Sequence, residues 1–314
     1  MTTPGPATAY PGPAAASAAP VGLPVSRRCL VMGVVNVTPD SFSDGGAWLE
    51  PAAAVAHGLQ LAADGADIVD VGGESTRPGA QRVDEQEELR RIGPVVSELA
   101  AAGLVVSVDT MRAAVAEFAL GAGARLVNDV SGGQADARLP RVVASAGVPY
   151  VIAHWRGFSR DMYGRAAYGD VVREVGEELA ARVDAVTEAG VDPAAVVVDP
   201  GIGFAKLSGH NWALLSRLDE ISRLGGRTFP VLIGASRKSF LGRLLADRQG
   251  EPRAAEGRDA ATVAVSTLAA ASGAWCVRVH AVAANADAVR VAARWRDARA
   301  PQTAGRPESA GRAG

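Results

Sequence analysis

The chain has 314 residues and a formal net charge of −2, with 32 basic and 34 acidic residues interspersed along it. No basic stripe is present, which argues against a nucleic-acid-binding surface, and no apolar stretch is long enough to span a bilayer. A length of this size can hold one large domain or two ordinary ones, and we expect one domain with two tails.

The two ends of the chain differ in composition from the part between them. Residues 1–26 are rich in Pro, Ala and Thr, and residues 299–314 in Gly, Ala, Pro and Arg, so both are predicted to be disordered tails around a domain over residues 27–298. The N-terminal tail lacks the basic start and apolar stretch of a secretory signal. Cys29 and Cys276 are expected to be buried reduced thiols, which indicates a cytoplasmic protein.

Eight short runs of Val, Leu and Ile recur along the chain, and each ends at a polar or charged residue. Strands buried on both faces have this continuous apolar character, and strands that alternate with helices form parallel sheets. The runs cover residues 30–35, 68–71, 105–108, 126–130, 150–153, 196–198, 231–233 and 275–279. The polar residues that follow them include Asn36, Thr76, Asp109, Asn128, His154, Asp199, Ser236 and His280.

Longer segments with helical spacing separate these runs. They cover residues 52–63, 84–101, 113–120, 139–146, 169–189, 211–223, 259–271 and 285–296. Eight such units predict an α/β fold, the (β/α)8 or TIM barrel, which takes about 250 residues. Its active sites lie at the carboxyl ends of the strands, so we expect the polar residues to lie together there.

Two carboxylates, an amide and a lysine are expected at this end of the barrel. They belong to Asp109, Asp199, Asn128 and Lys238. A carboxylate can accept two parallel N–H bonds, and a lysine can donate to a carbonyl of the same ring. This set suits a 2-amino-4-oxo heterocycle such as a pterin or guanine. An Asp after a strand can also serve only as the N-cap of the next helix.

Cationic residues indicate an anion site near the same end. Arg278 and His280 alternate in the last strand, whose following loop commonly binds phosphate in this fold, and Arg77 lies in the loop after the second strand. Asn36, followed by Thr38 and Asp40, offers hard oxygen ligands for a Mg²⁺ ion held partly by substrate phosphates. In the simpler interpretations, Arg278 is a surface cation, His280 a rim histidine with its hydrogen bonds satisfied, and Arg77 a solvated loop charge. The segment that begins at Asn36 would then be an ordinary turn.

The sequence contains no Cys/His metal cluster, no GxSxG elbow, no Walker loop and no clean GxGxxG after a strand. No spacing sets up a nucleophile with its own base. We therefore expect a displacement between two bound substrates, driven by positioning and charge stabilisation.

Seven segments between residue 30 and about residue 295 resemble the dihydropteroate synthases of folate biosynthesis, most closely their actinobacterial form. They are "MGVVNVTPDSFSDGG", "GADIVDVGGESTRPGA", "VSVDT", "VNDVSGG", "DPGIGFAK", "GASRKSFLG" and "RVH". The resemblance implies condensation of 6-hydroxymethyl-7,8-dihydropterin pyrophosphate with p-aminobenzoate to give 7,8-dihydropteroate and pyrophosphate. It also implies Mg²⁺ as cofactor, sulfonamides as inhibitors, small molecules as partners and a homodimer through the last helices.

The resemblance also assigns roles to individual positions, with Asp109, Lys238, Arg278 and His280 as the catalytic set. Pterin would be bound by Asp109, Asn128, Asp199 and Lys238; pyrophosphate by Thr76, Arg77, Arg278, His280 and Asn36, the last also holding Mg²⁺; and p-aminobenzoate by Phe42, Pro78, Phe204 and Ser236. The arylamine is neutral and nucleophilic, so the difficult step is expulsion of pyrophosphate. We expect an SN1-like displacement under closed loops that exclude water.

Two positions depart from the family pattern. Ala153 stands where the family usually has Met, and Ala281 follows "RVH" where it usually has Asp. We expect these changes to tune pterin affinity and the orientation of Arg278 or His280. A non-catalytic pterin-binding paralogue is one alternative. A methyltetrahydrofolate-type methyltransferase is another, although it would not need "SRKS" or "RVH".

Overall fold

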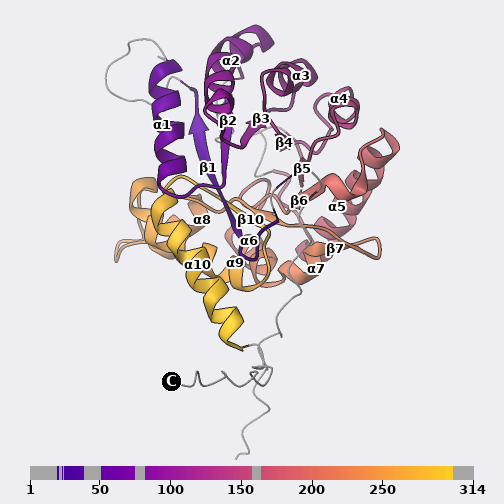
Figure 1. Ribbon diagram of the computed structural model, residues 1–314. Helices are drawn as coiled ribbons and strands as arrows, with labels where there is room; N and C mark the ends of the chain where they lie inside the picture. The colour runs from indigo at the N-terminus through magenta and orange to yellow at the C-terminus, as the bar shows by residue number, and fades with distance from the viewer. Residues whose placement is uncertain are drawn as a thin grey trace, which may run out of the picture.

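The computed structural model describes residues 20, 23, 25–38, 51–74, 82–157 and 164–299 (Figure 1). Eight parallel strands form a barrel surrounded by helices, which confirms the predicted (β/α)8 fold. The strands are β1 (Leu30–Asn36), β2 (Ile68–Gly72), β3 (Val106–Asp109), β4 (Leu126–Asp129), β5 (Tyr150–Ala153), β6 (Val196–Asp199), β9 (Leu232–Ile233) and β10 (Cys276–Val279).

The strands pair in the order that a closed barrel requires. The sheet runs β6-β5-β4-β3-β2-β1-β10-β9, so the first and last barrel strands are neighbours, with Leu30 paired to Cys276. The two outer strands meet through a parallel bridge between Val198 and Val231, supported by a 2.9 Å bond from the Val198 amide to the Pro230 carbonyl. The cylinder is therefore closed by a narrow contact on this side.

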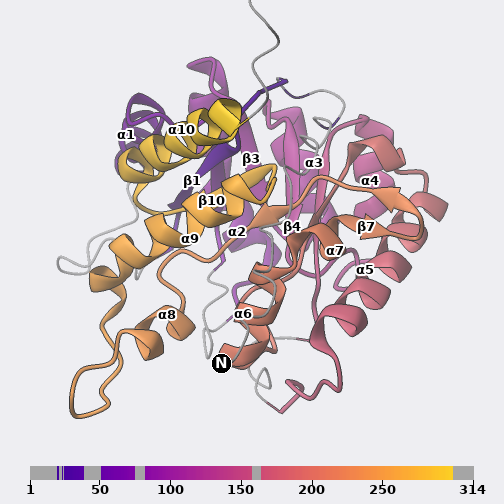
Figure 2. The same ribbon diagram turned by 90° about the horizontal axis from the view of Figure 1, so that it is seen from below.

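Helices surround the strands in chain order, and the last helix returns to lie beside the first (Figures 1 and 2). The helices are α1 (Pro51–Ala63), α2 (Glu85–Ala101), α3 (Ala113–Gly121), α4 (Leu139–Ala146), α5 (Val171–Glu188), α6 (Ser208–Ser216), α7 (Leu218–Ser222), α8 (Ser239–Leu244), α9 (Asp259–Ala271) and α10 (Val282–Arg299). Within the described residues, no helix combines the length and apolar character needed to cross a bilayer.

The single helix predicted over residues 211–223 is wrong. The helix breaks at Arg217, whose φ and ψ are −130° and 44°, and a two-stranded hairpin follows, β7 (Arg223–Leu224) and β8 (Arg227–Thr228). Gly225 and Gly226 both have positive φ, at 55° and 77°, as the turn of a tight hairpin requires. The Gly-Gly pair was the signal for this turn.

Side chains on the two faces of the barrel strands form two separate apolar clusters. The outer cluster includes Val35, Val71 and Val108 and packs against the helices. The inner cluster includes Met32 and Leu126 and fills the amino-terminal end of the barrel. Toward the carboxyl ends of the strands the interior of the barrel becomes polar, and the candidate site lies there.

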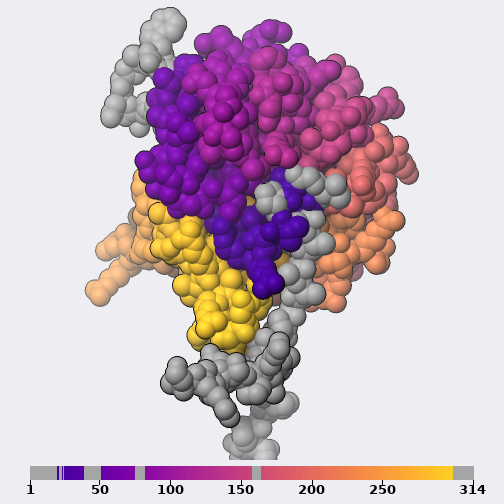
Figure 3. Space-filling view, viewed as in Figure 1, coloured from indigo at the N-terminus to yellow at the C-terminus, as the bar shows by residue number. Residues whose placement is uncertain are grey.

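The first described residues lie against the amino-terminal end of the barrel. Leu23 is buried in the inner cluster, and Arg28 forms two 2.7 Å bonds to Asp67. Arg296 of α10 donates to the carbonyl of Arg27, and Figure 3 shows these indigo residues beside the yellow helix. The predicted domain limits and disordered tails remain predictions, because most tail residues lie outside the described ranges.

Both cysteines are free and buried, as predicted. Burial raises the pKa of each thiol well above its ordinary value, which keeps both sulfurs protonated and unreactive.

Candidate active site

Four side chains from four strands meet in the polar half of the barrel. The Arg278 guanidinium donates through Nε to Asp70 Oδ2 (2.6 Å) and through Nη2 to Asp109 Oδ2 (2.7 Å). The amide of Asn128 donates to the same Asp70 oxygen at 3.0 Å. The Asp70 carboxylate on β2 thus joins Arg278 to Asn128, and Arg278 in turn joins Asp109 to the cluster.

Burial of this cluster changes its protonation. Burial raises the pKa of Asp109 to about 7, and the negative charge of Asp70 adds to the effect, whereas Arg278 opposes it. Burial lowers the pKa of Arg278, but the charges of Asp70 and Asp109 outweigh this and raise it overall. Arg278 is therefore a permanent cation, while Asp109 changes charge near neutral pH.

Asp199 and Lys238 form a second charged pair at the same end of the barrel. A Cβ added to Gly234 would lie 3.8 Å from Lys238 Nζ and 4.0 Å from Asp199 Oδ2, so both groups border this glycine. Burial raises the pKa of Asp199, and the Lys238 charge opposes the rise. Burial lowers the pKa of Lys238 to about 8, with Asp199 acting in the opposite direction.

The loop after β6 brings an aromatic ring to this pair. Lys238 Nζ lies 4.5 Å from the centre of the Phe204 ring and donates to the Ile202 carbonyl. Gly203 has a φ of 82°, and a Cβ there would approach Lys238 Cδ to 2.9 Å. Gly201 donates to Asp199 Oδ1 at 2.7 Å. The glycines of "DPGIGF" therefore let the backbone approach both charged side chains.

Ser236 and His280 form a third contact. The Ser236 hydroxyl lies 2.9 Å from His280 Nδ1 and accepts the His280 backbone N–H at 3.2 Å. This brings a residue predicted for p-aminobenzoate beside one predicted for pyrophosphate. The roles of both remain predictions.

Asn36 lies at the end of β1, paired with Gly72 of β2 and half-buried. Among the described residues, no group of three His, Cys, Asp or Glu side chains could hold a metal. One neutral amide oxygen fits a Mg²⁺ ion bound mainly by water and substrate phosphates, which is the usual way proteins hold this ion at phosphate sites.

Several predicted residues lie outside the described ranges. Within the two loops that follow β1 and β2 these are Asp40, Phe42, Thr76, Arg77 and Pro78. Their assignments remain predictions.

Sequence reasoning missed Asp70, which has a fully buried side chain and joins Arg278 to Asn128. The signal was present, because a carboxylate interrupts the apolar run "IVDV" in mid-strand. Burial of an unpaired charge is costly, so a charge at such a position indicates a partner inside the barrel.

Lys206 and His154 were also left without a role. Lys206 Nζ bonds to His154 Nδ1 at 2.9 Å and donates to the Phe204 carbonyl at 3.1 Å, while His154 Nε2 lies 2.9 Å from Glu178. Burial lowers the pKa of His154 to about 4, so the ring is neutral and donates through Nε2. These contacts fix Lys206, which in turn holds the backbone of the loop at Phe204.

The two departures from the family pattern have clear positions. Ala153 is buried and pairs with Asp199 in the sheet, which places it beside the second charged pair. The Ala281 carbonyl accepts a 2.6 Å bond from Asn285. Arg278 and His280 keep their own partners in the chain without a carboxylate at position 281. The effect of either change on activity remains a prediction.

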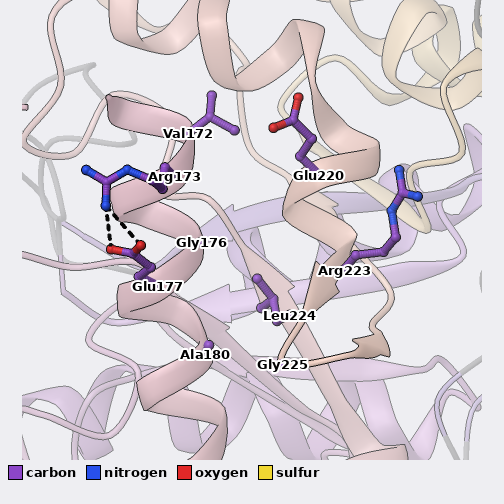
Figure 4. Close-up of a pocket in the computed structure, with 9 residues that line it drawn as sticks. All are labelled: Val172, Arg173, Gly176, Glu177, Ala180, Glu220, Arg223, Leu224 and Gly225. Atoms are coloured by element: carbon purple, nitrogen blue, oxygen red, sulfur yellow. Dashed lines mark hydrogen bonds and ion pairs between the residues drawn. The ribbon is translucent and has the colours of Figure 1, made fainter. Parts of the chain in front are cut away.

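A groove of about 450 Å³ lies elsewhere, between α5 and the β7–β8 hairpin. Figure 4 shows it lined by Gly176 and Leu224 in the middle and by charged side chains around them. None of its lining residues belongs to the strand-end site.

Comparison with known proteins agrees with the geometry of the strand-end site. A family model described as "Pterin binding enzyme" matches residues 32–280. The dihydropteroate synthase of Mycobacterium leprae is 57% identical over 266 residues, which cover 84% of this chain and 93% of that protein. The chain belongs to the dihydropteroate synthase family. It is a transferase of the actinobacterial type, as the resemblance predicted.

Solved structures of the family share the fold. One is a Xanthomonas albilineans dihydropteroate synthase with 4-aminobenzoic acid, at a TM-score of 0.78 and 45% identity, covering 87% of this chain and 94% of that one. Another is the Yersinia pestis enzyme in a sulfonamide drug complex, at a TM-score of 0.81 and 36% identity, covering 90% and 99%. The barrel described here is thus the fold of this family.

Proposed function

We propose that the chain condenses 6-hydroxymethyl-7,8-dihydropterin pyrophosphate with p-aminobenzoate, giving 7,8-dihydropteroate and pyrophosphate. The observation that carries the proposal is the linked cluster of Asp70, Asp109, Asn128 and Arg278 inside the barrel. It combines acceptors for a pterin with a permanent cation for the leaving group. Family membership supports the same reaction.

The charged groups suit the heterocycle. The carboxylates of Asp109 and Asp199 accept N–H bonds from the amino-pyrimidine edge of the pterin, and the Lys238 ammonium donates to its carbonyl. The Phe204 ring, near the Lys238 ammonium, gives the neighbouring p-aminobenzoate an apolar surface. Specificity follows because a ring without these donors would leave buried carboxylates unpaired.

The same charges favour a dissociative displacement. Pyrophosphate leaves with a large negative charge, which Arg278 and His280 stabilise, and the remaining pterin cation is stabilised by Asp109 and Asp199. The arylamine then attacks the cationic carbon and loses its proton. Asn36 would hold a Mg²⁺ ion together with the substrate phosphates, and such an ion would neutralise part of the charge of the leaving group.

Release of pyrophosphate from the purified protein tests this function. With both substrates and Mg²⁺ present, we expect stoichiometric pyrophosphate and dihydropteroate, and chelation by EDTA should suppress both until Mg²⁺ is restored. Release of pyrophosphate without p-aminobenzoate would support the dissociative order of events. Pterin binding without turnover would instead identify a non-catalytic paralogue, and the proposed reaction would be wrong.

We also propose a cytoplasmic homodimer formed through α9 and α10. The two helices pack against each other and expose Leu268, Val291 and Trp295 at 65%, 61% and 67%. Val291 and Trp295 are four residues apart and so share a face of α10, and exposed large apolar side chains on one face are typical of an interface between subunits. The buried free thiols of Cys29 and Cys276 agree with a reducing compartment.

The variant V291E/W295E is expected to be monomeric, because each subunit would bring two carboxylates to the interface and these would repel the same two of the other subunit across the twofold axis. Analytical ultracentrifugation at several concentrations measures the change in mass. Phe118→Glu on α3, where Phe118 is 48% exposed, is the matched control and should remain dimeric. A monomeric wild type would contradict the proposal.

A further inference from the structure

Asp70 is a charged residue in a place where the fold offers little water. It lies in the middle of β2, between Val69 and Val71, and its side chain has no exposed surface. One oxygen, Oδ2, accepts both the Arg278 guanidinium and the Asn128 amide. The other oxygen, Oδ1, is buried and has no hydrogen-bond partner among the described residues. Burial of such a group costs folding free energy, which indicates that Asp70 has a function at the site.

The two carboxylates that hold Arg278 differ in access. The Asp109 side chain is 9% exposed and the Asp70 side chain is fully buried, while the Arg278 side chain is 21% exposed. A heterocycle whose N–H groups donate to Asp109 shares this carboxylate with Arg278 Nη2, which donates to Oδ2. Asp70 lies deeper in the barrel, so its bond to Arg278 Nε persists when a substrate takes Asp109.

The shared oxygen also links the two halves of the site. Arg278 belongs to the predicted anion set and Asn128 to the predicted pterin set, and both donate to Asp70 Oδ2. Neither of these two donors can move without losing its bond to the same atom. The contacts join residues that are 208 and 58 positions apart in the chain.

We propose that Asp70 is a positioning residue for this reaction, which fixes the Arg278 guanidinium and the Asn128 amide through one oxygen while substrate occupies Asp109. The proposal rests on the proposed function. Asp70 itself need not touch the reacting atoms. It holds Arg278 where pyrophosphate leaves and keeps the amide of Asn128 aimed at the pterin.

The test is Asp70→Asn, which keeps the size of the side chain but removes its charge. We expect kcat/KM for the pterin pyrophosphate to fall about 10- to 100-fold, as when an oriented ligand loses its supporting carboxylate. The KM for p-aminobenzoate should stay within about twofold. Calorimetry with inorganic pyrophosphate and with 6-hydroxymethylpterin should show both weakened. A general loss of packing would instead lower the melting temperature without this selectivity.

Asp129→Asn is the matched control. Asp129 is also a fully buried carboxylate, on β4, but its oxygens accept from Ser131, Gly133 and Tyr150. We expect this variant to be less stable yet to keep wild-type affinity for both ligands. Equal loss of affinity in the two variants would overturn the proposal.

A double-variant comparison covers the case in which D70N alone does not fold. D70N/R278M removes both charges together, which proteins commonly tolerate. If Asp70 acts through Arg278, the D70N change should not weaken pyrophosphate binding further in the R278M background. A further tenfold loss there, or D70N binding both ligands like the wild type, would overturn the proposal. Absence of wild-type turnover would contradict only the proposed function, because the binding measurements need no catalysis.

Discussion

Replacing Arg278 with Ala is expected to lower kcat/KM for pyrophosphate release by about 10³-fold or more, as seen when a charge-stabilising arginine is removed from a phosphoryl site. Two effects contribute. The leaving pyrophosphate loses a permanent cation, and Asp70 and Asp109 lose the guanidinium that bonds to both. The second effect raises the pKa of Asp109 further, so the pterin loses a charged acceptor as well. Steady-state kinetics with a coupled pyrophosphate assay measures the loss.

Arg28→Ala is the matched control for this experiment. Arg28 also forms a two-bond ion pair, with Asp67, but at the opposite end of the barrel. We expect a modest loss of stability, because the pair is partly exposed, and kcat/KM within about threefold of the wild type. Near-normal turnover in the Arg278→Ala variant would contradict the assigned role.

Pterin affinity is expected to be highest between about pH 7 and 8. Burial raises the pKa of Asp109 to about 7, so below this pH the carboxyl becomes protonated and can no longer accept two N–H bonds. Burial lowers the pKa of Lys238 to about 8, so above this pH the donor charge is lost. Titration calorimetry with 6-hydroxymethylpterin across pH 5–9 measures the acid limb and the basic limb of this affinity profile.

The acid limb should disappear in Asp109→Asn, along with about 10²-fold of affinity at pH 7.5, the loss expected for a buried charge-assisted hydrogen bond. Asp136→Asn is the control that should keep the limb. The Arg138 side chain lowers the pKa of Asp136 to about 2, so Asp136 does not titrate in this range. An acid limb that persists in Asp109→Asn would assign it to another group.

The raised pKa of Asp109 also affects folding stability, which changes with pH in the opposite direction to pterin affinity. The folded protein binds this proton more tightly than the unfolded chain, whose pKa lies near 3.8. The contribution of Asp109 to stability therefore falls as the pH rises from about 4 to about 7, and it is constant above that. The pH that suits pterin binding is thus one at which this carboxylate destabilises the fold, as is common for functional groups.

The architecture was predictable from the sequence because each barrel strand is buried on both faces. Continuous apolar runs such as the one ending at Asp109 coincide with strands, and the glycine at 147 ends α4 in the left-handed conformation that the residue type favours. The error at residues 211–223 arose because helical spacing continues through Arg217, where the backbone itself leaves the helical conformation.

The site was predictable only in part, because local sequence determines where a strand ends but not which side chains meet across the barrel. Position at a strand end follows from local sequence, so the apolar runs alone place Asp109, Asn128 and Asp199 at one end of the barrel. Contacts across the barrel do not follow from local sequence. Ser236 was expected beside p-aminobenzoate, and the structure places its hydroxyl against His280, 44 positions away.

The sequence by itself determined the barrel, the end of it that carries polar groups and the family, because apolar periodicity and ordered motifs are local properties of the chain. Only the tertiary structure decided which carboxylate holds which cation. The resemblance assigned Arg278 to pyrophosphate, and closure of the barrel places its guanidinium against Asp70 and Asp109, two partners that the sequence did not indicate. Burial there then sets the charge of Asp109, because removal of water penalises its ionised form.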